Sequence, residues 1–293
     1  MRNEGLEPDL AIWNSLISGY SQLGKGFWSF KYFKKMQSAG ISPDLKSLTS
    51  VLSSCSDLPV LRSGKEIHGH ATRIHVSSDK FMATTLIDFY MKCGLPSWAR
   101  IIFDGFAVKP EDPAIWNAMV SGFGRNGDYQ SSFEFFDQML RQNVQPNSAT
   151  FVSVLSTCGH SGLVDKGWEL FRMMSTKFGL KPKPVHFSCM VDLLARCGRL
   201  GDARELLQEL PKPSASVFAS LLSAYRSNLD PELGEEMAKK IIELEPNNPI
   251  PYLVLSNIYA ELGRWRDAER IRGMINYKTY RKSPGFSLIE AAQ

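Results

Sequence analysis

The amino-acid sequence predicts an all-α fold, a solenoid of stacked helical hairpins, on three observations. One stretch occurs twice: WNSLISGYSQLG, from Trp13 to Gly24, returns as WNAMVSGFGRNG, from Trp116 to Gly127, and a weaker copy begins at Phe218. The distance between copies suits three helix-turn-helix units, so a short repeat is nested in a longer one. Helical stretches are separated by Pro-Asp or Pro-Asn pairs, as at 43–44 and 146–147. No segment shows the sustained period-two alternation of a half-buried strand.

The composition is that of a globular chain with a modest positive charge. Charged residues make up 22% and hydrophobic residues 43% of the 293 residues, enough apolar surface for a continuous core. The formal net charge is +4, and all of the excess lies in residues 1–214, because residues 215–293 hold ten basic and ten acidic residues. This balance permits a polyanionic partner but equally suits a solvated, Lys-rich repeat surface.

The first nine residues resemble the end of a repeat. MRNEGLEPD matches MQSAGISPD, from Met36 to Asp44, and MLRQNVQPN, from Met139 to Asn147. We therefore expect residues 1–9 to end a preceding repeat and the chain to be the C-terminal part of a longer protein. The N-terminus has the features of neither a signal peptide nor a transit peptide, so any targeting segment is expected upstream. No apolar run reaches membrane-spanning length, and no membrane contact is expected.

The Pro-Asp-like exits divide the chain into successive helical hairpins. The predicted units are 10–44, 45–79, 80–112, 113–147, 148–183, 184–214, 215–248 and 249–284, with a tail at 285–293. In the first unit, Gly24 and Gly26 are expected to form the turn between helices that start near Ile12 and Phe27. Apolar residues at helical spacing predict one buried stripe per helix: Ile12, Leu16, Ile17 and Tyr20, then Phe27, Phe30, Phe33 and Met36.

The later hairpins follow the same logic. Stripes of the second and third units are predicted at Leu48, Val51, Leu52 and Cys55, with Ile67 in the following helix, then at Leu86, Ile87 and Tyr90, with Ala99, Ile102 and Phe103 in the last helix. The next three units repeat the first three. In the last unit, residues at tetratricopeptide-like spacing predict a hairpin of a different type: Tyr252, Leu255, Tyr259, Gly263 and Ala268.

The five cysteines form no C-x-x-C pair. Four of them occupy matched repeat positions, Cys55 with Cys158 and Cys93 with Cys197, which indicates reduced packing residues rather than disulfides or metal ligands.

At this level of detail the sequence resembles the plant pentatricopeptide repeat family, in its PLS class with a C-terminal E domain. The phrases that carry the resemblance are WNSLISGYSQLGK, LTSVLSSCSDL with GKEIHGHA, LIDFYMKCG, TFVSVLSTCGHSGLVDKG, CMVDLLARCGRLGDA and YLVLSNIYAELGRWRDAERIR, and they cover essentially the whole chain. The resemblance implies a right-handed α-solenoid with the repeats P1, L1, S1, P2, L2 and S2, followed by two tetratricopeptide-like hairpins, E1 and E2.

The resemblance also implies a function, since members read single-stranded RNA in organelles and E-class members select sites for cytidine-to-uridine editing. In the family's pattern, the fifth residue of a repeat and its last residue choose the base. Carried over to this chain, the pairs are Asn14 with Asp44, Thr49 with Asp79, Thr84 with Asp112, Asn117 with Asn147, Val152 with Lys183, and Ser188 with Ser214.

By this analogy P1 prefers uracil, S1 prefers guanine and P2 prefers a pyrimidine. An Asn amide both donates and accepts, whereas a hydroxyl with a carboxylate can accept from guanine. Val152 can make no such hydrogen bond, so L2 is expected to be a spacer, and S2 is left undecoded. The second residue of a repeat wedges a base in this family, and Phe81 and Val185 are the only good wedges among Ala11, Lys46, Phe81, Ala114, Ala149 and Val185.

No enzymatic activity or cofactor is expected, because the H-x-E and P-C-x-x-C signature of zinc deaminases does not occur. The resemblance implies that a deaminase-bearing protein and accessory editing factors dock through residues 215–284. It places the protein in a mitochondrion or alternatively a chloroplast. Two other functions remain open: an adaptor that binds only proteins, and an organellar RNA processing or stability factor. A Ser, Thr or Asn on any helical repeat also serves as a solvated or capping residue.

Two further patterns are interpreted as decoys. The stretch from Gly19 to Lys25 resembles a phosphate-binding loop, but Gly26 replaces the Ser or Thr that would meet magnesium and no strand precedes it. The histidines lack the spacing of a metal site and are expected to be surface or packing residues: His68, His70, His75, His160 and His186.

Overall fold

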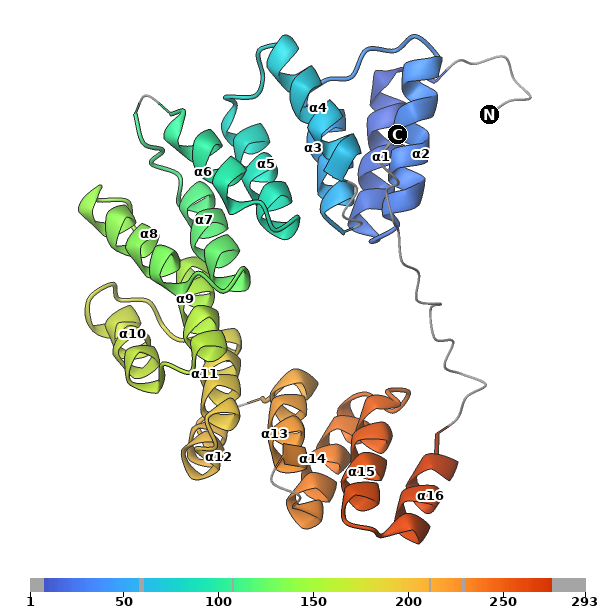
Figure 1. Cartoon of the computed structure of the whole chain (residues 1–293), viewed down its shortest axis with the longest axis vertical. Coiled ribbons are helices and arrows are strands. Elements are labelled where there is room, and N and C mark those ends of the chain that lie inside the picture. Colours follow the sequence, from blue (N-terminus) through green and yellow to red (C-terminus); the bar gives the residue numbers. More distant parts are fainter. Residues whose placement is uncertain (1–7, 58–60, 107, 211, 228–229, 276–293) are drawn as a thin grey trace. The chain divides into compact units, whose positions relative to one another are not determined.

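The computed structural model describes residues 8–57, 61–106, 108–210, 212–227 and 230–275. Within these ranges all regular structure is helical, as Figure 1 shows, and the prediction of an all-α solenoid of helical hairpins is confirmed. The chain divides into two compact bodies. The N-terminal body comprises residues 1–161 and 169–180, and the C-terminal body comprises residues 162–168 and 181–293.

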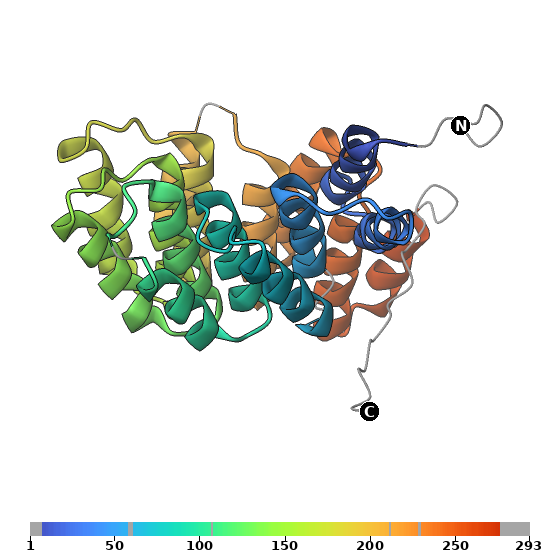
Figure 2. The same ribbon diagram turned by 90° about the horizontal axis from the view of Figure 1, so that it is seen from above.

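The N-terminal body is a run of hairpins whose succession can be followed in Figures 1 and 2. Its helices are α1 (Leu10–Gln22), α2 (Gly26–Ser38), α3 (Leu45–Asp57), α4 (Leu61–Arg73), α5 (Lys80–Lys92), α6 (Pro96–Asp104), α7 (Pro113–Arg125), α8 (Tyr129–Arg141) and α9 (Ser148–Ser161). The first helices of the hairpins pack in series, α1 on α3, α3 on α5, α5 on α7 and α7 on α9. Equivalent positions on these helices therefore recur along one continuous layer.

The C-terminal body follows the same plan. Its helices are α11 (Pro184–Arg196), α12 (Leu200–Gln208), α13 (Ala215–Ser227), α14 (Pro231–Leu244), α15 (Ile250–Glu261) and α16 (Trp265–Gly273), while α10 (Val164–Thr176) contributes residues to both bodies. Helix α13 packs on α11 and on α15. In the last hairpin, Leu255, Tyr259 and Ala268 are buried, as the tetratricopeptide-like spacing predicts. None of the helices in the described ranges combines the length and apolar character needed to span a bilayer.

Acidic residues at the hairpin exits determine where the first helices begin. The Asp9 carboxylate accepts a hydrogen bond from the Ile12 backbone N–H at 2.9 Å, and Asp112 accepts from Ala114 N–H at 2.9 Å. Each such carboxylate satisfies an N–H group that has no partner inside the helix, which typically stabilises a helix by about 1 kcal/mol. The Pro-Asp exits are thus helix N-caps as well as boundaries.

The predicted stripe on α2 is only partly right, because Phe33 and Met36 are buried but Phe27 is not. Phe27 is 65% exposed, and the buried face of this helix consists of Gly26, Ser29, Phe33 and Met36. The buried Ser29 hydroxyl donates to the Ile17 carbonyl at 3.0 Å, and Ser132 donates in the same way to Val120 at 2.8 Å on α8. Ser29 thus faces α1, and Phe27, two positions earlier in the helix, faces solvent. Gly26 is also a helical residue of α2 rather than part of the turn.

The cysteines are only partly the packing residues that the sequence predicts. Cys158 is buried, but Cys197 is exposed and caps the end of α11. Its Sγ atom donates to the Gly162 carbonyl at 3.7 Å. The side chain of Cys55 lies outside the described residues.

Two glycines of α4 provide a test of how closely α4 approaches α5. A Cβ atom at Gly64 would lie 1.9 Å from Cζ of Phe89, whereas one at Gly69 would meet nothing within 4 Å. Phe89 is fully buried, so Gly64→Ala is expected to lower the free energy of unfolding by about 1–3 kcal/mol through overpacking. Gly69→Ala should raise it by roughly 0.5–1 kcal/mol, because Ala favours a helix over Gly. Chemical unfolding midpoints measure both, and a stabilising Gly64→Ala would contradict the described packing.

Candidate nucleic-acid interface

An open groove in the N-terminal body collects five of the predicted RNA-contacting residues. Its volume is about 600 Å³, and residues of α3, α5 and the first turn of α7, with the exits that precede them, line it. The predicted residues in its lining are Asp44, Thr49, Phe81, Thr84 and Asp112, and Lys46 and Lys80 lie among them. Polar acceptors, two cations and an aromatic ring therefore border one surface that is open to solvent.

Asn14 and Asp44, the first predicted pair, are in direct contact. Asn14 Nδ2 donates to Asp44 Oδ2 at 2.9 Å. Asn14 is only 5% exposed, so Asp44, which is half-buried, is the more accessible member of the pair. Burial alone would raise the pKa of the Asp44 carboxyl, but hydrogen bonds from Ser47 and Asn14 outweigh this effect and hold the pKa below its usual value. Asp44 is therefore a carboxylate at neutral pH.

Asn117 and Asn147 repeat this arrangement in the fourth hairpin. Asn117 Nδ2 donates to Asn147 Oδ1 at 3.3 Å. The Oδ1 atoms of Asn14 and Asn117 are both buried without a hydrogen-bond partner among the described residues, so the two amides are oriented alike. In both hairpins, the fifth residue directs its donor towards the exit residue.

The threonine pairs behave differently. Thr49 Oγ1 donates to the Leu45 carbonyl at 2.9 Å and Thr84 Oγ1 donates to the Lys80 carbonyl at 2.7 Å, so both hydroxyl protons are used within their own helices. The exit carboxylates cap the next helix through backbone N–H groups only, Asp79 on α5 and Asp112 on α7. The threonines thus fill less of the space beside the exit residue and offer an acceptor oxygen.

The predicted wedge residues are accessible. Phe81 is 62% exposed on the first turn of α5, and the Lys80 ammonium lies 5.0 Å from the centre of its ring. In the C-terminal body Val185 is 44% exposed on the first turn of α11. An exposed aromatic ring beside a lysine can stack on a base while the cation meets a phosphate.

Ser188 and Ser214, the predicted pair of the C-terminal body, bond within their own segments. Ser188 Oγ donates to the Pro184 carbonyl at 2.9 Å, and the hydroxyls of Ser214 and Ser216 are 2.8 Å apart. Of the undecoded pair, Val152 is half-buried on α9, and Lys183 is exposed before α11.

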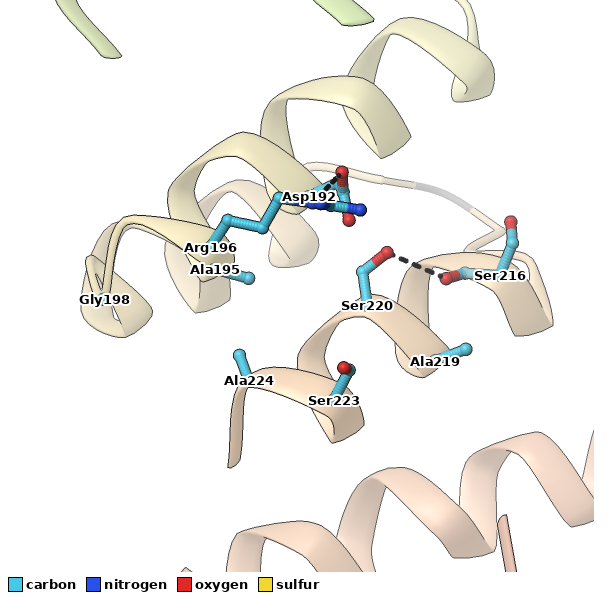
Figure 3. A pocket seen from close by; sticks show the side chains of 9 residues that line it. All are labelled: Asp192, Ala195, Arg196, Gly198, Ser216, Ala219, Ser220, Ser223 and Ala224. Carbon is cyan, nitrogen blue, oxygen red and sulfur yellow. Dashed lines mark hydrogen bonds and ion pairs between the residues drawn. The ribbon is translucent and has the colours of Figure 1, made fainter. Parts of the chain in front are cut away.

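A second groove, which the sequence analysis did not predict, lies between α11 and α13 in the C-terminal body. Its volume is about 610 Å³, and Figure 3 shows the small side chains that border it. Ser220 donates to the Ser216 carbonyl at 3.3 Å, and Arg196 pairs with Asp192 at 2.8 Å on the opposite helix. Small side chains on both helices leave this space open. The sequence signal that could have predicted it is the recurrence of Ser and Ala at one-turn spacing on α13, at Ser216, Ala219, Ser220, Ser223 and Ala224.

The decoy patterns have structural roles. Gly19 lies inside α1, so the segment from Gly19 to Lys25, which resembles a phosphate-binding loop in sequence, is the end of a helix and the turn that follows it. His68 Nδ1 is 2.9 Å from the Tyr90 hydroxyl, and burial lowers the pKa of its imidazole. His186 is buried, and its Nδ1 accepts from the Lys183 backbone N–H at 2.8 Å. Among the residues with described coordinates, no group of three His, Cys, Asp or Glu side chains is placed to hold a metal ion.

Family models match most of the chain. A model described as PPR repeat matches residues 11–41, 149–177 and 185–212, and a PPR repeat family model matches residues 111–160. A model described as E motif matches residues 228–290.

Curated relatives from Arabidopsis thaliana have the same repeats. The pentatricopeptide repeat-containing protein At2g02750 is 53% identical over 96% of this chain and 51% of its own length. The mitochondrial pentatricopeptide repeat-containing protein At1g06140 is 39% identical over 97% of this chain and 51% of its own length. The chain thus spans about half the length of these relatives.

Solved structures agree on the fold. The crystal structure of the pentatricopeptide repeat protein PPR10 in complex with an 18-nt psaJ RNA element gives a TM-score of 0.59 at 18% identity, over 96% of this chain and 47% of that one. The crystal structure of PPR10 from maize gives a TM-score of 0.55 at 20% identity, over 96% of this chain and 46% of that one. With the repeat spacing and the hairpin geometry, these matches show that the chain belongs to the pentatricopeptide repeat family and carries an E motif in its C-terminal part.

Proposed function

We propose that this chain is a sequence-specific single-stranded RNA-binding protein of a plant organelle that selects sites for cytidine-to-uridine editing. The observation that carries the proposal is the groove on α3, α5 and α7, where Asp44, Thr49, Phe81, Thr84 and Asp112 meet. Equivalent positions on packed first helices recur at regular intervals, so that each hairpin can face one unstacked base. The protein acts without a catalytic residue or cofactor of its own.

The two kinds of pair suit different bases. Asn14 with Asp44 offers a carboxylate acceptor, Asn117 with Asn147 offers an amide donor, and each can bond the edge of a pyrimidine. Thr84 leaves space, and the Asp112 carboxylate can accept from the N–H groups of guanine. Phe81 stacks against a neighbouring base, and Lys46 and Lys80 are placed to meet phosphates.

The editing role rests on the E motif and on exposed apolar side chains in the same region. We propose that a deaminase-bearing protein docks on residues 215–284, of which 228–229 and 276–284 lie outside the described residues. Large apolar side chains are exposed on and between α14, α15 and α16, and Trp265 is 69% exposed. The others are Leu244, Ile250, Leu253, Leu262 and Met274. An exposed apolar surface of this kind is typical of a protein-binding site.

The proposed compartment is the mitochondrion, since several relatives that are 36–39% identical carry that word in their names. A chloroplast is the alternative. Sequencing organellar transcripts from a knockout plant decides both the compartment and the role. Loss of editing at one or a few cytidines supports the proposal, and complete editing of every organellar cytidine contradicts it.

Selection from a randomised single-stranded RNA pool tests binding by the purified chain. An RNA reader enriches a motif with a fixed order of preferences, whereas an adaptor that binds only proteins enriches nothing. A motif found together with normal editing but altered transcript abundance would instead support an RNA processing or stability factor.

A further inference from the structure

Two buried hydroxyl groups hold the exit residues of the Asn-containing pairs. Ser47 and Thr150 are each the third residue of a first helix, and both are fully buried. Ser47 Oγ accepts from the Asp44 backbone N–H at 2.9 Å, and the Ser47 backbone N–H donates to Asp44 Oδ1 at 2.8 Å. The Ser47 backbone N–H occupies Oδ1, so that Oδ2 is the oxygen that meets Asn14, while the Ser47 hydroxyl also donates to the Asp44 carbonyl at 2.9 Å and so holds the backbone of the exit residue.

Thr150 holds Asn147 in the same way, with a further consequence for the amide. The Asn147 backbone N–H donates to Thr150 Oγ1 at 3.0 Å, and Asn147 Oδ1 accepts from the Thr150 backbone N–H at 3.0 Å and from Thr150 Oγ1 at 3.2 Å. A flipped amide would bring its NH₂ group against the Thr150 backbone N–H and Asn117 Nδ2, both of which can only donate. The network therefore fixes Oδ1 inward and leaves the Nδ2 donor of the exposed Asn147 for a ligand.

The threonine-containing pairs have no such hydroxyl. The third residues of α5 and α7 are Met82 and Ile115, which are apolar and buried. Asp79 and Asp112 are held only by backbone N–H groups of the next helix. The hydroxyl at the third position is thus found where the fifth residue is Asn and is absent where it is Thr, in these four hairpins.

We infer that Ser47 and Thr150 are positioning residues for base selection, which orient the exit residues Asp44 and Asn147 towards the base. The inference rests on the proposed RNA-reading function. The Thr150 hydroxyl adds a bond that holds Asn147 Oδ1 inward, and the Ser47 hydroxyl holds the Asp44 backbone N–H and carbonyl, and with them the direction of the carboxylate that meets Asn14. Neither hydroxyl touches the base, because both are buried beneath the exit residue.

The experiment measures binding of the whole chain to four RNAs that differ only at the nucleotide facing the fourth hairpin. That nucleotide is identified as the one at which the double variant Asn117→Thr with Asn147→Asp changes the base preference. Thr150→Val is expected to lower the discrimination among the four RNAs about tenfold, since one aligned hydrogen bond is worth about a factor of ten. Discrimination at the nucleotide facing Thr84 should not change. Thr150→Ser, which restores the hydroxyl, should restore discrimination.

Thr157→Val is the matched control. Thr157 is also a buried hydroxyl residue of α9, but it donates to the Ser153 carbonyl at 3.0 Å and lies away from the exits. Its loss should lower the melting temperature without changing discrimination at any single nucleotide. The inference is wrong if Thr150→Val discriminates among the four RNAs as well as the original chain does. It is also wrong if the variant loses discrimination equally at every nucleotide, because a general loss of structure would have that effect.

Ser47→Ala, on α3, provides an independent measurement for the base-reading pair of the first hairpin, and it carries the test alone if Thr150→Val does not fold. It should lower discrimination only at the nucleotide facing that hairpin, and Ser47→Thr should restore it. Unchanged discrimination in Ser47→Ala overturns the inference. If the unmodified chain enriches no RNA at all, the proposed function fails instead, and the two failures are thereby distinguished.

Discussion

The double variant Asn117→Thr with Asn147→Asp is expected to change the preferred nucleotide at one position from a pyrimidine to guanine. The ratio of affinities for the two RNAs should shift by about 10- to 100-fold, since a good polar contact to a base edge is worth roughly 1–3 kcal/mol of discrimination. Equilibrium titrations against RNAs that differ at that nucleotide measure the shift. Base changes at other positions of the RNA should alter the affinity of the variant as they alter that of the original chain.

The physical reason is that the exchange gives the fourth hairpin the chemistry of the third. A threonine in place of Asn117 would turn its hydroxyl to the backbone of its own helix, as Thr84 does at 2.7 Å, and withdraw the donor that now meets Asn147. A carboxylate in place of the Asn147 amide can then accept from guanine. The variant should fold, because Asp caps a helix as well as Asn does. It also removes the buried, unpaired Oδ1 of Asn117.

The reciprocal variant, Thr84→Asn with Asp112→Asn, is the matched control for the first. It should move the preference at the adjacent position from guanine towards a pyrimidine and leave the fourth hairpin unchanged. If the first variant binds RNA with its pyrimidine preference intact, then Asn117 and Asn147 do not face a base.

Much of the fold follows from the sequence because the repeat places the same local signals at the same positions. The hairpin exits of the N-terminal body end in Asp or Asn, and such residues cap helices that begin directly after them, as Asp79 and Asp112 do. Glycines with positive φ, such as Gly24 at 65° and Gly127 at 80°, end the turns of the two matching stretches. These signals are local, so they can be read without knowledge of tertiary packing.

The buried face of α2 could not be predicted from apolar periodicity. That stripe includes Phe27 and omits Ser29, although Ser29 is buried and donates to Ile17. The signal was present, because Ser132 occupies the matching position of the next long repeat and donates to Val120. A hydroxyl that satisfies a carbonyl of the facing helix is buried despite its polarity, and hydrophobic patterns do not detect such residues.

The candidate site was predictable in its positions but not in its contacts. The family resemblance places Asn14 and Asp44 at base-choosing positions, but their 2.9 Å contact depends on side-chain directions, to which the Ser47 N–H bond to Asp44 Oδ1 contributes. The direction of the Thr49 hydroxyl, towards the Leu45 carbonyl, likewise depends on competition between its own helix and the exit residue. The signal for Ser47 and Thr150 was a hydroxyl residue three positions after an exit Asp or Asn, which is a capping pattern.

Phe81→Ala is expected to weaken RNA binding about 10- to 100-fold, since stacking of one base on an aromatic ring is worth roughly 1–3 kcal/mol. Phe81 is 62% exposed and borders the groove beside Thr84 and Asp112, so its loss removes contact area for the RNA rather than core packing. The melting temperature should therefore change little. Titration with the RNA enriched from the randomised pool measures the effect, and Phe81→Trp should retain most of the affinity.

Phe27→Ala is the matched control for this substitution. Phe27 is 65% exposed on α2, the second helix of its hairpin, and the centres of the Phe27 and Trp28 rings are 5.7 Å apart. It is an equally accessible phenylalanine outside the groove, so its removal should leave affinity for RNA unchanged. Equal losses in the two variants would indicate a general effect of exposed aromatic residues on binding. Unchanged affinity in Phe81→Ala would show that this ring does not contact the bases, because a stacked base cannot lose its partner without a measurable cost.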